Sequence, residues 1–173
     1  MAPVDVENFA RRFPNLASNL TRDEANNFLS ILKRQEFEAS EALIDEGTLS
    51  DSLFLVWDGE LDVLTNTPEG ERKVAQLGPG EFFGEISVLS PGPTTATVRS
   101  EQGCTTLHLT RSSLEQFWQQ YPHAATVFMQ ELSRLVARRI RAADEMLDQL
   151  LLAGDLQPDV LIAVHTKLLK EAK

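Results

Sequence analysis

The sequence predicts a mainly β fold, an antiparallel jelly-roll-like β-barrel (double-stranded β-helix) with N-terminal helices before it and a long helix after it. Three observations support this fold class. Short β-rich runs fill the middle of the chain, glycine-containing turn pairs separate them, and apolar residues recur at helical spacing near the end. The runs follow one another too closely to leave room for the helices of parallel βαβ units.

Residues 1–35 are predicted to form N-terminal helices. Apolar residues recur at Phe9, Phe13, Leu16, Leu20, Phe28, Leu29 and Leu32. Pro14 interrupts this pattern, which therefore indicates two short helices. Thr21 precedes Asp23 and Glu24, an arrangement typical of a helix N-cap followed by acidic residues in the first turn.

Residues 36–111 are predicted to form the barrel. The β-rich runs are Ala42 to Ile44, Leu53 to Trp57, Glu60 to Leu64, Arg72 to Leu77, Thr97 to Ser100 and Thr105 to Leu109. The turn pairs between them contain Gly47, Gly59, Gly70, Gly78 and Gly80, most simply as residues that the backbone geometry of a turn requires. Strands this short, separated by such turns, favour a meander or a double-sheet roll.

Residues 112–153 are predicted to form a hinge and a long dimerisation helix. Ser112 or Ser113 can cap the first helix, and Pro122 divides a short helix from a long one. The apolar seam of the long helix consists of Met129, Leu132, Val136, Ile140, Ala143, Leu147 and Leu150. Because this seam is narrow, it suits a partner helix, and we expect a homodimer through the helix around Met129 to Leu150.

The end of the chain is predicted to form one more helix. Gly154 is a helix stop, and residues 154–173 form the C-terminal helix, with Pro158 at its beginning. No helix-turn-helix is recognisable there, so the pattern argues against direct binding to DNA.

The amino-acid composition limits the classes of function that the chain can have. The chain has 173 residues, 42% of them hydrophobic, which is enough for one domain and an appendage. Its net charge of −10 argues against nucleic acid as a partner. The single Cys104 cannot form an internal disulfide, and no signal peptide or membrane span is visible, so we expect a cytoplasmic protein.

The segment from Gly78 to Val98, called the cassette below, carries the functional signal. Its glycines lead from a strand into a short helical turn, which leaves backbone N–H groups free to bind an anion. Glu85 is unexpected beside such a site, since a carboxylate repels phosphate. It can instead accept hydrogen bonds from hydroxyl groups such as those of a ribose. Together these features predict a nucleotide contact. The alternative is that Glu85 caps the cassette helix or pairs with a basic neighbour.

At these residues the chain resembles the cyclic-nucleotide-binding family of catabolite-activator-type regulators, kinase regulatory subunits and gated channels. The resemblance begins at Leu43-Ile44-Asp45-Glu46-Gly47, continues through Asp51 to Val63 and the cassette, and extends into the long helix after Ser113. It covers about two-thirds of the chain. Each motif is weak alone, but their order and spacing are specific for the fold.

The resemblance implies cyclic AMP, cyclic GMP or a related phosphate as ligand, with no cofactor. Gly84 matches the glycine whose backbone approaches the phosphate, and Glu85 matches the acid that binds the ribose. Thr95 matches a position that touches phosphate or base, and Ala96 one that offers its amide. The implied ligand-binding residues are Phe83, Gly84, Glu85, Ile86, Ser87, Thr94, Thr95 and Ala96.

Thr94 departs from the family pattern. It stands where cyclic-nucleotide binders usually place an arginine that pairs with the phosphate. A charge-assisted hydrogen bond contributes about 1.5–3 kcal/mol net, so its loss weakens phosphate binding by about one to two powers of ten. Arg99 follows on a predicted strand, but the sequence does not fix which face its side chain occupies.

Two principal hypotheses follow. The chain is either a non-enzymatic sensor of a cyclic nucleotide or related phosphate, or a ligand-free interaction and oligomerisation module for an unidentified protein partner. A regulator of the DNA-binding kind is a third alternative. We assign no catalytic or metal-binding residue, because the histidines have no partner at ligand spacing and no nucleophile elbow is present.

Overall fold

The computed structural model describes residues 3–154. The helices are α1 (Val6–Arg12), α2 (Pro14–Ala17), α3 (Arg22–Ile31), α4 (Glu85–Leu89), α5 (Arg111–Gln120) and α6 (Pro122–Ala153). The strands are β1 (Lys33–Phe37), β2 (Ala42–Ile44), β3 (Leu49–Ser50), β4 (Ser52–Asp58), β5 (Leu61–Thr67), β6 (Gly70–Leu77), β7 (Phe82–Phe83), β8 (Gly92–Pro93), β9 (Thr97–Arg99) and β10 (Cys104–Thr110).

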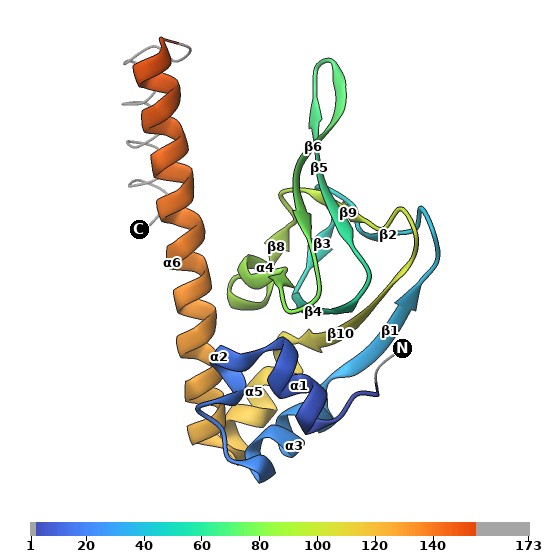
Figure 1. Cartoon of the computed structure of the whole chain (residues 1–173), viewed down its shortest axis with the longest axis vertical. Coiled ribbons are helices and arrows are strands. Elements are labelled where there is room, and N and C mark those ends of the chain that lie inside the picture. Colours follow the sequence, from blue (N-terminus) through green and yellow to red (C-terminus); the bar gives the residue numbers. More distant parts are fainter. Residues whose placement is uncertain (1–2, 155–173) are drawn as a thin grey trace. The chain divides into compact units, whose positions relative to one another are not determined.

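All strand pairs are antiparallel and form three small sheets. Their orders are β1-β10-β4-β7, β2-β9-β5-β6 and β3-β8. Apart from the β5–β6 hairpin, the paired strands are not consecutive in the chain, as in β2 with β9, where Ile44 pairs with Val98. The β5–β6 hairpin extends from the barrel, and α4 lies against β4 (Figure 1). The predicted fold class is confirmed.

Strand β4 is buried on both faces because it separates two hydrophobic layers. Phe54 and Val56 join the barrel cluster, which also contains Ile44, Leu61, Leu77, Phe83, Val98 and Cys104. On the opposite face Trp57 is fully buried and meets α1: the Arg12 guanidinium stacks on its ring at 4.5 Å and donates to its carbonyl oxygen at 2.7 Å. The N-terminal helices thus cover the outer face of this sheet.

Aromatic rings hold the helices together. Phe28 of α3 contacts Phe9, Phe117 and Phe128, with ring centroids 5.9, 5.6 and 5.0 Å apart. Helices α1, α2, α3 and α5 accordingly lie grouped beside the barrel (Figure 1). Fully buried aromatic side chains contribute several kcal/mol each, about 25 cal/mol per Å² of apolar area, so this cluster is a main source of stability.

Several local predictions are confirmed. Thr21 caps α3, and its hydroxyl accepts from the Glu24 amide within a complete capping box. Gly47, Gly59, Gly70 and Gly80 all have positive φ, as their turns require. Helix α5 ends before Tyr121, and α6 begins at Pro122.

Other boundaries differ from the predictions. Pro14 begins α2 and does not simply break a helix, so the N-terminal segment holds three helices. The barrel begins at Lys33 and not at residue 36. The sequence pattern did not reveal β1, because this strand is largely exposed and lacks an alternation of apolar and polar residues. Helix α5 is capped by Thr110 and not by Ser112 or Ser113, since β10 passes into α5 without a loop.

The chain divides into two compact units, Met1–Glu131 and Leu132–Lys173, and the division falls within α6. In the second unit the helix continues to Ala153 and stops at Gly154, whose φ is 80°. The predicted C-terminal helix lies outside the described residues. Among the helices of residues 3–154, none combines the length and apolar composition needed to cross a membrane.

Candidate functional site

The first half of the cassette, Phe83 to Ser87, turns from β7 into α4 at Gly84. Gly84 has a φ of 80° and forms the N-cap of α4. A Cβ atom at this position would lie 2.3 Å from the Ser52 carbonyl oxygen. Only glycine fits here, because both the backbone conformation and the space against β4 exclude a side chain.

Burial differs among the four residues beside Gly84. Phe83 is 4% exposed and stacks on Phe54, with ring centroids 4.8 Å apart, so it belongs to the barrel core. Glu85 is 5% and Ser87 7% exposed, whereas Ile86 is 54% exposed. Burial of a carboxylate is costly unless polar or charged groups compensate it.

Several backbone N–H groups of the cassette donate to no protein acceptor within residues 3–154. Those of Ile86, Ser87, Thr95 and Ala96 are among them, and we call these four the amide set. The amides of Ile86 and Ser87 lie in the first turn of α4, where N–H groups have no acceptor within the helix. The first helical hydrogen bond runs from the Val88 amide to the Gly84 carbonyl oxygen, at 3.1 Å. The amide set thus provides donors for an external acceptor.

The second half of the cassette, Thr94 to Ala96, lies between β8 and β9, and Thr94 is bound to the turn from Asp45 to Thr48. Its hydroxyl donates to the Asp45 carbonyl oxygen at 2.7 Å. Its own amide donates to the Thr48 carbonyl oxygen, and its carbonyl oxygen accepts from the Gly47 amide, both at 2.9 Å. Thr94 therefore joins the cassette to this turn of the barrel through its side chain and its backbone.

Thr97 and Arg99 also have partners within the barrel. The Thr97 hydroxyl accepts from the Glu46 amide at 3.0 Å. Arg99 pairs with Glu71 of β6 at 2.5 Å, and this hydrogen bond raises the pKa of the guanidinium. The sequence did not fix which face of its strand the Arg99 side chain occupies, and in the structure this side chain points toward Glu71.

Sequence reasoning missed the turn from Asp45 to Thr48 as a partner of the cassette. The sequence does contain a signal for this turn, because Asp45 is followed three residues later by Thr48. In the structure the Thr48 hydroxyl donates to the Asp45 carbonyl oxygen at 2.6 Å. Next to it, a cavity of about 490 Å³ is lined by Leu49, Ser50, Asp51, Ser52, Pro91 and Gly92. None of the predicted site residues lines this cavity.

Two titratable groups of the barrel interior are perturbed by burial. Burial raises the pKa of the Cys104 thiol to about 11, so this cysteine is protonated and unreactive at neutral pH. Burial, followed by the charge of Lys33, lowers the pKa of His108. Within the described residues no three His, Cys, Asp or Glu side chains are grouped to hold a metal ion.

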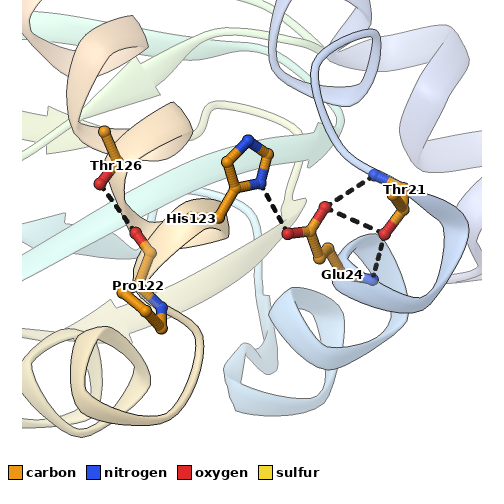
Figure 2. A network of polar contacts seen from close by, with 5 residues as sticks. All are labelled: Thr21, Glu24, Pro122, His123 and Thr126. Atoms are coloured by element: carbon orange, nitrogen blue, oxygen red, sulfur yellow. Dashed lines mark hydrogen bonds and ion pairs between the residues drawn. The ribbon is translucent and has the colours of Figure 1, made fainter.

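The predicted hinge is joined to α3 by a polar network. His123 Nδ1 lies 2.7 Å from Glu24 Oε1, and the same carboxylate accepts from the amide and hydroxyl of Thr21, each at 2.9 Å. Thr126 donates to the Pro122 carbonyl oxygen at 2.7 Å (Figure 2). The start of α6 is thus tied to the capping box of α3.

Comparisons with known proteins agree with this architecture. A family model described as the cyclic nucleotide-binding domain matches residues 34–121. The cyclic AMP receptor protein of Thermus thermophilus is 32% identical over 136 residues, which cover 78% of this chain and 61% of that protein. A cAMP-dependent protein kinase regulatory subunit of Mycosarcoma maydis is 32% identical over 109 residues, 56% of this chain and 21% of the subunit.

A solved structure extends the likeness to three dimensions. The crystal structure of Thermus thermophilus catabolite activator protein matches with a TM-score of 0.69 at 32% identity, over 79% of this chain and 62% of that chain. This chain therefore spans about three-fifths or less of the length of these relatives.

Proposed function

Because the chain belongs to the cyclic nucleotide-binding domain family, we propose that it is a non-enzymatic sensor domain whose ligand is cyclic AMP, cyclic GMP or a related phosphate. The relatives named above are a receptor for cyclic AMP and a regulatory subunit of a kinase. A regulatory role is the simplest function that this chain shares with them.

The observation that carries this proposal is the buried Glu85 next to Gly84 and the amide set. Glu85 is 5% exposed, and a ribose offers the hydroxyl donors that such a carboxylate accepts. The N–H groups of Ile86, Ser87, Thr95 and Ala96 are donors for phosphate or ribose oxygens. Thr94 contributes no charge, so phosphate binds about one to two powers of ten more weakly than with an arginine.

Signal transfer would use the break between α5 and α6. A ligand that orders the segment from Phe83 to Leu89 would favour one setting of the hinge at Tyr121 and Pro122. The ligand shifts this equilibrium only by the difference between its affinities for the two settings. The bond between His123 and Glu24 is one contact that such a shift would strengthen or break.

A thermal-shift titration tests the proposal. Cyclic AMP or cyclic GMP at 100 times its dissociation constant stabilises the protein by about 2.7 kcal/mol, which raises the melting temperature by several degrees. Glu85→Gln should remove most of this shift, because an amide is a weaker acceptor than a carboxylate. Glu69→Gln, an exposed control, should keep it. No shift with either nucleotide at millimolar concentration would contradict the proposal.

The second candidate function is a ligand-free interaction and oligomerisation module. The commitment of the Thr94 hydroxyl to the Asp45 carbonyl oxygen favours it, since the position that should meet phosphate instead completes the barrel. An unidentified protein partner would then replace the small molecule as the regulatory input. The same titration separates the two candidates.

We also propose a homodimer through α6. In the second unit Ile140 is 57% and Leu150 36% exposed, and both belong to the predicted seam. Exposed apolar side chains at heptad spacing are stabilised when a partner helix covers them. Ile140→Glu combined with Leu147→Glu should convert a dimer into a monomer in sedimentation-velocity experiments, and a wild-type monomer at micromolar concentration would contradict the dimer.

The remaining features fit a protein of the cytoplasm. The lone cysteine is buried, as expected for a protein of a reducing compartment. The net charge of −10 disfavours nucleic acid as a partner of this segment.

A further inference from the structure

We propose that the outer edge of β1 pairs with the same edge of a second copy of this chain. The two strands run antiparallel about a two-fold axis at Gln35, so that the sheet β7-β4-β10-β1 continues into its copy. This surface is separate from α6 and involves no ligand, so the inference goes beyond the proposed function and does not depend on it. Two features of β1 carry it, namely its open edge and the order of its charges.

Strand β1 is the last strand of its sheet and pairs only with β10 among residues 3–154. It lies at the margin of the barrel, beside β10 (Figure 1). In an antiparallel pair, about half of the main-chain N–H and C=O groups of a strand point away from its neighbour. Within the described part of the chain, those of β1 form no other backbone hydrogen bond. This edge is therefore open to another extended strand.

The side chains of β1 leave its edge accessible. Its first four residues are exposed, and Phe37 is partly buried against the barrel cluster. A proline, a bulge or charges commonly block such an edge, and of these β1 has only the charges. Their order decides which partners are excluded.

The charges of β1 complement one another in one antiparallel arrangement. Arg34 and Glu36 lie on the same face of the strand, where they form an ion pair at 2.7 Å. With the two-fold axis at Gln35, Arg34 of each copy lies directly opposite the partner's Glu36. This gives two cross-strand pairs of opposite charge, which favour this direction and register, while the main-chain hydrogen bonds supply the attraction.

The neighbouring symmetric registers are unfavourable. A two-fold axis between antiparallel strands keeps each face of the sheet on the same side, so the residues that it places opposite each other must share a face. The axis therefore passes through a residue position. Moving it to Arg34 or to Glu36 places that residue opposite its own copy, and like charges directly opposite each other destabilise the pair. A parallel pairing in register has the same defect at every charged residue.

Sedimentation equilibrium of the full chain tests this pairing. All proteins carry Ile140→Glu and Leu147→Glu, which remove the contact proposed for α6. On this background we compare Arg34→Glu, Glu36→Arg and the two changes combined. Arg72→Glu is the matched control, because it makes the same change of charge at an exposed position of β6, the edge strand of another sheet. Circular dichroism confirms that each variant is folded.

The background protein and Arg72→Glu should dimerise at concentrations up to about 1 mM, a high range because an interface of five residues per strand is small. Each single reversal at β1 creates two like-charge pairs and should weaken dimerisation about ten- to a hundredfold. The combined variant should regain it. An equimolar mixture of the two single variants should form a heterodimer, since every charge then faces its opposite.

A background protein that stays monomeric at about 1 mM overturns the inference. A dimer that the single reversals leave unchanged overturns it too, because it would use another surface. If the single reversals abolish the dimer but neither the combined variant nor the mixture restores it, the proposed register is wrong. Each of these results leaves the proposed ligand-binding function intact, since no ligand is present.

Discussion

The two halves of the cassette differ in what their polar groups do. In the half from Phe83 to Ser87, the Ile86 and Ser87 amides have no protein acceptor within residues 3–154, and Glu85 is buried beside them. In the half that begins at Thr94, the hydroxyl and backbone bonds of Thr94 lead to the turn from Asp45 to Thr48, and only the Thr95 and Ala96 amides belong to the amide set. The first half thus offers polar groups suited to a ligand, whereas Thr94 in the second half stabilises the barrel.

This difference shows that one segment can carry two functions with separate physical requirements. Gly84 is required because a Cβ atom would collide with β4, whether or not a ligand binds. Glu85 is not part of the hydrophobic cluster of the barrel, and the role proposed for it is to bind the ligand. A segment can therefore match a family motif over its whole length even though most of its residues stabilise the fold and only a few are suited to bind a ligand.

The largest effect is expected at Gly84. Gly84→Ala places a methyl group 2.3 Å from the Ser52 carbonyl oxygen in a left-handed backbone conformation. Because neither backbone can yield without loss of the β4 contact, we expect a loss of roughly 3 kcal/mol in unfolding free energy. Urea denaturation followed by circular dichroism measures it.

Gly47→Ala is the matched control for this variant. Gly47 has nearly the same φ, 81°, but nothing lies within 4 Å of a Cβ atom built on it. It should lose only about 1 kcal/mol, from the backbone conformation alone. Equal losses at Gly47 and Gly84 would contradict the packing role assigned to Gly84.

An intermediate effect is expected at Thr94. Thr94→Val keeps the shape of the side chain and removes the hydroxyl that donates to the Asp45 carbonyl oxygen. We expect a loss of about 1 kcal/mol, the usual net contribution of a partly exposed hydrogen bond. Thr95→Val, at an exposed neighbour, should change the free energy of unfolding by less than about 0.5 kcal/mol. A larger loss at Thr95 than at Thr94 would reverse the assignment of the two residues.

The smallest effect is expected at Glu24, away from the cassette. The Thr21 backbone amide, and then His123, lower the pKa of this carboxyl. A lowered folded-state pKa gives stability that is present above the unfolded-state pKa and is lost as the pH falls through the folded-state value.

Denaturation at a series of acidic pH values tests this assignment. Glu24→Gln keeps a capping-box residue but removes the charge, so its stability should depend less on acidic pH than that of the wild type. Identical pH dependence in the two proteins would show that the network in Figure 2 contributes nothing measurable.

The fold was largely predictable from the sequence because its signals are local. Glycine turns between β-rich runs, the Thr21 cap and the Pro122 break each depend on residues close together in the chain. Strand β1 and the Thr110 cap escaped prediction, because one is exposed on most of its length and the other joins a strand directly to a helix.

The sequence could nominate residues for the site, which stay a prediction, but it could not indicate their partners in the barrel. The departure at Thr94 was visible in the sequence, whereas its bond to Asp45 spans 49 positions and depends on how β3 pairs with β8. The same holds for Arg99, whose partner Glu71 is set by the strand order β9-β5-β6 in the sheet. Contacts between distant strands require the register, which no local pattern contains.

The most direct test of the contrast between the two halves is the change in backbone amide chemical shifts on adding cyclic AMP or cyclic GMP to ¹⁵N-labelled protein. The account predicts large shifts for Glu85, Ile86 and Ser87 and small ones for Gly47 and Thr94, whose N–H groups already have barrel acceptors. Shifts confined to residues outside the cassette, or none at millimolar ligand, would contradict it.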